Sequence, residues 1–153
     1  MKIKKFVQEG IKAKKLRVPA NETILAQNDN SKEIYFIESG EVRIQRRVPE
    51  LEREVEIAIL KGGEFFGELA VMRGRPRNAD VVAVTDCELW TMDTKSFKES
   101  IRKNPEFALS IVEGLCHKVD SVNQKNEDTY TKFKEFTNRF EEVSVLWHSL
   151  VPY

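Results

Sequence analysis

Two side chains near the middle of the chain could together hold a phosphate group and a sugar hydroxyl. Arg77 carries a planar guanidinium whose donors match phosphate oxygens, and Glu68 carries a carboxylate that accepts hydrogen bonds from hydroxyl groups. Gly67 permits a tight backbone approach, and residues 68–72 can form one helical turn whose first N–H groups face an anion. The spacing therefore predicts an anion site beside a hydroxyl site.

The stretch of residues 66–79 reads FGELAVMRGRPRNA and resembles the phosphate-binding cassette of the cyclic nucleotide-binding domain family. Residues 24–29 and 34–42 resemble an early strand and the next hairpin of that family, so the resemblance covers roughly residues 15–125. It implies that the ligand contacts are Phe66, Gly67, Glu68, Leu69, Ala70, Arg77, Asn78 and Ala79. The alternative is a β-turn with a surface arginine, in a roll that has lost its ligand.

Composition gives no global charge signal. The 153 residues carry 25 basic and 25 acidic side chains, so nothing overall favours nucleic acid or an anionic membrane. Cys87 and Cys116 lack a C-x-x-C spacing and are expected to be reduced thiols. Neither a run of ~18 apolar residues nor a signal-peptide core occurs. We expect a cytoplasmic protein without a membrane span.

The elements that must position the cassette can be predicted from periodicity. Residues 2–15 hold six lysines, with Phe6 and Ile11 at helical spacing, which predicts a short basic helix that docks on the rest of the domain. Attachment of this helix to a membrane or nucleic acid is the alternative. Turn residues separate short β-rich runs at Thr23–Leu25, Glu33–Glu38, Glu41–Arg47, Val55–Leu60, Val81–Val84 and Glu88–Met92. This pattern predicts a roll or barrel of short strands.

After Met92 the apolar period changes to that of a helix. Asp93 or Thr94 can cap a short helix ending near Lys103, and Pro105 suits the first turn of a long one. A heptad pattern follows, with Val112, Val119, Asn126, Phe133, Phe140 and Trp147 at a, and Leu115, Val122, Thr129, Phe136, Val143 and Leu150 at d. This repeat predicts a coiled coil.

The predicted fold is therefore α+β: an antiparallel, jelly-roll-like β-roll of about eight short strands, with a short N-terminal helix and a long C-terminal dimerisation helix. Residues 1–104 would form the binding domain and residues 105–153 the coiled-coil helix. The predicted homodimer seam consists of Leu115, Val119, Val122, Asn126, Phe133, Phe136 and Phe140. The bulky aromatic residues at the a positions of the heptad leave antiparallel or higher-order packing of the helix open. A helix that folds back on its own roll is a further alternative.

The resemblance also implies how the base is recognised. Bacterial regulators of the family dimerise through such a helix, which closes over the base, and the shared Asn104-Pro105 step aligns Val122 and Asn123 with their base contacts. Val122 offers no polar group, whereas the Asn123 amide can donate and accept. Cyclic GMP-selective members commonly have a threonine where this chain has Asn78, which favours cAMP over cGMP.

No catalytic or metal-binding set accompanies the cassette. His117 and His148 lie 31 positions apart without partner ligands, and Ser31, Ser39 and Ser96 are interpreted as turn or cap residues. Related transcription regulators carry a helix-turn-helix after the dimerisation helix, but this sequence ends at Tyr153, so direct DNA binding is not expected. We expect a cAMP receptor without cofactor or enzymatic activity, read by an unknown effector protein. The alternative is a ligand-free roll that acts as a coiled-coil scaffold.

Overall fold

The computed structural model describes the backbone of residues 1–150 and the side chains of residues 1–139. It divides into two compact units, Met1–Gly114 and a second that starts at Leu115. The first unit is a β-roll with its helices, and the second is the continuation of the last helix. The heptad residues Phe140, Val143, Trp147 and Leu150 lie outside the described side chains.

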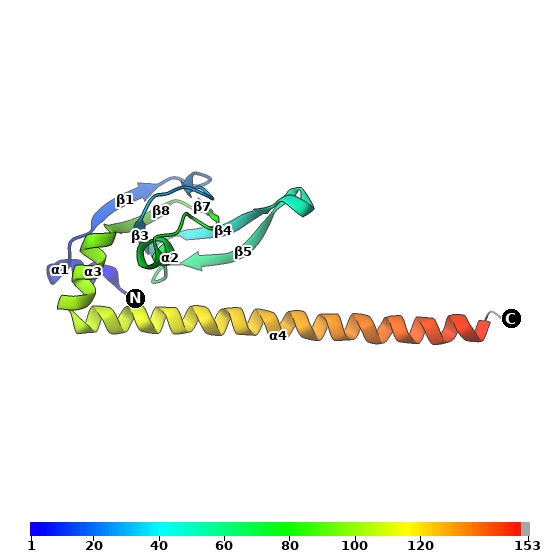
Figure 1. The fold of residues 1–153 in the computed structure, drawn as a ribbon. Helices are drawn as coiled ribbons and strands as arrows, with labels where there is room; N and C mark the ends of the chain where they lie inside the picture. Colours follow the sequence, from blue (N-terminus) through cyan, green and yellow to red (C-terminus); the bar gives the residue numbers. More distant parts are fainter. Residues whose placement is uncertain (151–153) are drawn as a thin grey trace. The chain divides into compact units, whose positions relative to one another are not determined.

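Two four-stranded antiparallel sheets build the roll (Figure 1). The first sheet has the order β1-β8-β3-β6, with β1 at Lys14–Val18, β8 at Cys87–Asp93, β3 at Glu33–Ser39 and β6 at Phe65–Phe66. The second has the order β2-β7-β4-β5, with β2 at Thr23–Leu25, β7 at Asp80–Ala83, β4 at Glu41–Val48 and β5 at Arg53–Lys61. The short helix η1, Pro49–Leu51, connects β4 to β5. The α+β roll that the sequence predicts is confirmed.

One apolar cluster joins the two sheets because buried side chains alternate along their strands. In β7, for example, Val81 and Ala83 are buried while Val82 between them is partly exposed. The cluster consists of Leu25, Ile37, Val42, Leu60, Phe66, Val81, Ala83, Cys87 and Leu89. Phe66, the residue before the cassette glycine, is thus held by the sheet core.

A second apolar cluster lies under the helices. α1 (Ile3–Gln8) and α3 (Thr94–Lys103) lie at the same end of the roll (Figure 1), and α4 (Pro105–Leu150) begins directly after α3. Phe107 of α4 is fully buried, 5.3 Å from the Phe6 ring and 6.2 Å from the Phe97 ring between centroids. As predicted, Asp93 caps α3 by accepting a 2.7 Å hydrogen bond from the Ser96 N–H.

The extent of the N-terminal helix was predicted wrongly. α1 ends at Gln8 rather than near residue 15, and Gly10 follows in the left-handed region at φ 105°. Lys14 and Lys15 pair with Thr91 and Trp90 of β8, so they belong to a strand. The docking part of the prediction is confirmed, since Phe6 and Ile11 are buried. The two-residue strand β6 was missed because only its pairing with β3 defines it.

The first turns of α4 pack on the roll at a point next to the cassette. Phe107 and Ile111, one helical turn apart, are buried. Gly114 continues the same face, and a Cβ atom there would overlap the ring of Phe65, which is 1% exposed. Phe65 is followed by Phe66 and then by Gly67. The absent side chain at position 114 therefore lets the helix approach the strand that leads into the cassette.

We expect Gly114→Ala to lower the free energy of unfolding by up to about 2 kcal/mol. The overlap with a buried ring costs about 1–3 kcal/mol, which exceeds the gain of about 1 kcal/mol in helix propensity. Urea unfolding followed by tryptophan fluorescence measures the difference. Ser121→Ala, at an exposed position of the same helix, is the control and should be neutral or slightly stabilising. A more stable Gly114→Ala protein would contradict the close approach.

Candidate functional site

The site begins where β6 turns into α2 (Glu68–Arg73). The Phe66 ring stacks on Tyr35 at 5.1 Å between centroids, which fixes the end of the strand. Gly67 adopts φ 88°, and a Cβ atom at this position would lie 2.7 Å from the Glu33 carbonyl oxygen and 2.8 Å from Arg77 Nη1. Only glycine suits both the left-handed conformation and the close contact. The first N–H groups of α2, which have no intrahelical acceptors, therefore follow directly on the turn.

Arg77 is buried and holds three backbone segments together. Its side chain is 3% exposed. Nε donates to Ser31 Oγ at 3.1 Å, Nη1 to the Gly67 carbonyl at 3.2 Å and Nη2 to the Glu33 carbonyl at 2.8 Å. Two backbone hydrogen bonds of 2.8 Å each, with Asn28 and Asp29, fix the main chain of Arg77. The guanidinium is thus oriented before any ligand arrives.

Several acidic groups surround this cation. Glu33 Oε2 lies 3.7 Å from Arg77 Nη2. Burial lowers the pKa of the Arg77 guanidinium. Tyr35 and then the carboxylates of Glu33, Asp29 and Glu68 oppose this effect, because negative charge nearby raises the pKa. Arginine nevertheless stays protonated. Hydrogen bonds from Ser31 lower the pKa of the Asp29 carboxyl group, and the charge of Arg77 adds to that effect. The site therefore combines one buried positive charge with three nearby carboxylates.

The structure brings together the central residues of the predicted site. Gly67 and Arg77 are in hydrogen-bond contact, and Glu68 is close enough to act on the guanidinium electrostatically. Of the other predicted contacts, Phe66, Ala70 and Ala79 are buried, while Leu69 and Asn78 are exposed. The Asn78 carbonyl accepts a 2.9 Å hydrogen bond from Arg46 Nε on β4.

The predicted base contacts belong to the other unit. Val122 is 57% exposed on α4, and Asn123 is exposed beside it. Their part in base recognition remains a prediction.

Sequence reasoning missed two residues that contact Arg77. Ser31 was interpreted as a turn residue, which the 3.2 Å hydrogen bond from its N–H to Asp29 Oδ1 supports. Ser31 also accepts a hydrogen bond from the Arg77 guanidinium, and Glu33 contacts the same guanidinium through its backbone carbonyl and its carboxylate. These contacts link residues more than 40 positions apart in the sequence. The turn residues predicted between Thr23–Leu25 and Glu33–Glu38 were the only local indication that the chain adopts a specific conformation there.

The described residues give no indication of a metal site or of a membrane-spanning helix. Within residues 1–139, no group of three or more His, Cys, Asp or Glu side chains is arranged to hold a metal ion. Across the described part of the chain, no helix combines the length and apolar character needed to cross a membrane. Both cysteines are free thiols, Cys87 buried and Cys116 exposed, and burial raises the pKa of the Cys87 thiol.

Because Arg77 satisfies three acceptors, its removal should affect folding as well as any ligand. We expect Arg77→Ala to lower the free energy of unfolding by about 1–3 kcal/mol, the usual cost of leaving buried polar groups without partners. Thermal unfolding followed by circular dichroism measures it. Arg75→Ala, in the exposed part of the same loop, should stay within about 0.5 kcal/mol of wild type. Equal stability of the two variants would argue against the anchoring role.

The chain is similar to known proteins in both sequence and fold. The chain is 27% identical over 110 residues to the CRP-like cAMP-activated global transcriptional regulator of Mycobacterium tuberculosis, covering 72% of this chain and 49% of that protein. It therefore spans about half the length of this curated relative. Among solved structures, the Thermus thermophilus catabolite activator protein is similar, with a TM-score of 0.65, 27% identity, and coverage of 75% of this chain and 54% of that one.

The regulatory domain of Toxoplasma gondii PKA, crystallised with cAMP, has a TM-score of 0.54 and 25% identity, covering 57% of this chain and 33% of that one. The family model described as the cyclic nucleotide-binding domain matches residues 15–104, which is more than half of the chain. The chain therefore belongs to the cyclic nucleotide-binding domain family.

Proposed function

We propose that this chain binds cAMP through the cassette of residues 66–79. The observation that carries the proposal is the buried, pre-oriented Arg77 guanidinium beside the Gly67 turn and the start of α2. A phosphodiester anion would accept hydrogen bonds from Arg77 and from the first N–H groups of α2. Similar proteins whose names or titles include cAMP support this choice of ligand.

The remaining ligand contacts follow from the same arrangement. Glu68, partly exposed at the first position of α2, would accept a hydrogen bond from the ribose 2′-hydroxyl. Asn78 stands where cGMP-selective members commonly have threonine, so cAMP is proposed over cGMP. Asn123 would contact the base through its amide, with Val122 packed against the ring.

We further propose that the protein is a cytoplasmic, non-enzymatic sensor. Residues 1–104 would bind the nucleotide, and residues 105–153 would transmit the change caused by nucleotide binding to an effector protein. Support comes from the family, a cyclic nucleotide-binding domain, and from the contact between the start of α4 and Phe65.

Glu68→Gln tests the proposed ribose contact. Wild type should bind cAMP much more tightly than 2′-deoxy-cAMP, because the deoxy compound leaves the carboxylate without a donor. In Glu68→Gln this preference should shrink by roughly tenfold, since charge-assisted hydrogen bonds contribute about twice as much as neutral ones. Isothermal titration calorimetry of both proteins with both ligands gives the four dissociation constants.

Glu64→Gln, which removes an equal charge before the cassette, is the control and should keep the wild-type preference. An unchanged preference in Glu68→Gln would place the ribose elsewhere. If neither ligand binds folded wild-type protein, the proposed function is wrong, and a scaffold role through the long helix becomes the better account.

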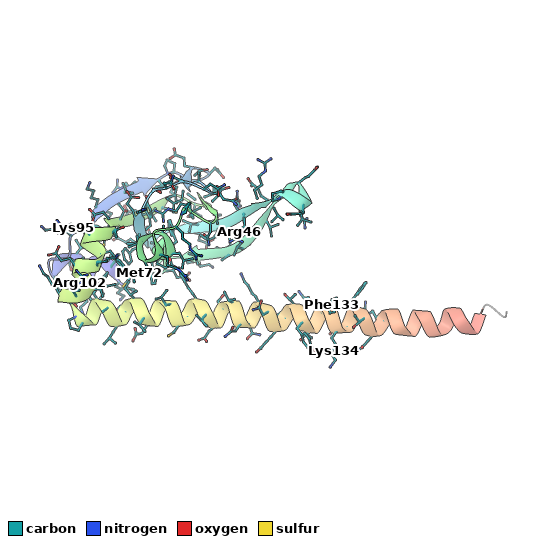
Figure 2. All side chains as sticks on the ribbon, viewed as in Figure 1. Arg46, Met72, Lys95, Arg102, Phe133 and Lys134 are labelled. Carbon is teal, nitrogen blue, oxygen red and sulfur yellow. The ribbon has the colours of Figure 1, made fainter. Side chains whose placement is uncertain are left out.

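We also propose that the chain forms a homodimer through α4. The seam residues whose side chains are described are all exposed in the single chain: Leu115, Val119, Val122, Asn126, Phe133 and Phe136. Phe133 is 64% exposed and projects from a different side of the helix than Lys134 (Figure 2). An apolar stripe of this length on one helix face is typical of an association surface. Asn126 at an a position would fix the register.

Val119→Asp should produce monomers, because each seam would then bury two like charges. Sedimentation velocity at tens of micromolar protein, with and without cAMP, measures the oligomeric state. If the seam and the base contacts share residues, the same variant should bind cAMP more weakly by about 1–3 kcal/mol. Ser121→Asp adds the same charge off the stripe and should remain dimeric. A monomeric wild type would contradict the proposed seam.

A further inference from the structure

Glu33 occupies a position at the site for which the proposed binding mode gives no role. It is the first residue of β3, and its backbone carbonyl accepts the 2.8 Å hydrogen bond from Arg77 Nη2. Its carboxylate Oε2 lies 3.7 Å from the same nitrogen. The Glu33 side chain is 41% exposed, whereas that of Arg77 is 3% exposed. An anion that reaches Arg77 from solvent therefore approaches a partly exposed negative charge as well.

The balance of charge around the guanidinium makes this carboxylate important. The single positive charge of Arg77 interacts electrostatically with the carboxylates of Glu33, Asp29 and Glu68. Asp29 is engaged by Ser31, and Glu68 is assigned to the ribose in the proposed function. The Glu33 carboxylate forms an ion pair with Arg77, with 3.7 Å between Oε2 and Nη2. Its charge thus offsets part of the attraction that Arg77 offers to a ligand.

We propose that Glu33 is a specificity-determining residue that makes the site discriminate against phosphate groups with more than one negative charge. The inference rests on the proposed function. A cyclic phosphodiester carries a single charge, whereas a phosphomonoester carries about 1.5 to 2 at neutral pH. Coulombic repulsion is proportional to the ligand's charge, so a fixed carboxylate penalises a monoester up to twice as strongly in free energy. Glu33 then favours cyclic nucleotides over their linear hydrolysis products.

Glu33→Gln isolates this charge from the packing of the site. Glutamine has the same shape, and the backbone carbonyl that anchors Arg77 is unaffected. The hydrogen bonds from Arg77 to Ser31 and Gly67 do not involve the changed group. Glu50→Gln, in the exposed turn between β4 and β5, removes the same charge from the chain and serves as the matched control.

The experiment is displacement of a fluorescent cAMP analogue by cAMP and by 5′-AMP from wild type and both variants, at low ionic strength. In Glu33→Gln, cAMP should bind about 3-fold to 5-fold tighter, as expected for a partly exposed ion pair. The affinity for 5′-AMP should rise by up to roughly the square of that factor. The preference for cAMP should therefore fall about 3-fold to 5-fold, and high salt should reduce the change. Glu50→Gln should keep the wild-type preference.

The outcomes separate the two proposals. If wild type binds cAMP but Glu33→Gln has the same preference, or binds cAMP more weakly, the role of Glu33 is overturned while the proposed function stands. If folded wild type binds no cyclic nucleotide, the proposed function fails and the inference falls with it.

Discussion

The buried Arg77 guanidinium is the interaction on which the site depends. It connects the segment before β3, the first residue of β3 and the turn that starts α2, through three hydrogen bonds to Ser31, Glu33 and Gly67. A positive charge in such a place is costly to desolvate unless its donors are paired. Pairing with neutral carbonyl and hydroxyl oxygens satisfies several donors and leaves the positive charge only partly offset. That residual charge is what an anionic ligand would meet.

The packing of the first unit links this site to the last helix. Phe65 lies under Gly114 at the start of α4 and is two residues before Gly67. Movement of the cassette on ligand binding would therefore change the surface on which α4 rests. The same helix carries the exposed apolar stripe, so the proposed sensing and dimerising parts meet in one continuous element. This arrangement gives a physical route for coupling two binding events, with each affecting the other by the same factor.

Much of this architecture could be predicted because local signals agree with the fold. Alternation of apolar residues located six strands, the Asp93 cap and Pro105 located the helix boundaries, and the pattern around Arg77 located the cassette. The strand Lys14–Val18 was missed because lysine-rich sequence next to an amphipathic helix looks helical until its pairing with β8 is known. Ser31 and Glu33 were missed for a similar reason. Their roles arise from contacts across more than 40 residues, which no local pattern records.

The most direct test of the central claim is a calorimetric titration of wild type and Arg77→Lys with cAMP, both checked for folding by circular dichroism. Wild type should bind one cAMP per chain, saturably. Arg77→Lys should bind roughly tenfold more weakly or worse, because lysine keeps the charge but lacks the planar fork of donors, and a hydrogen bond to a charged group contributes about 1.5–3 kcal/mol. Equal affinity of the two folded proteins, or no saturable binding by wild type, would contradict the account.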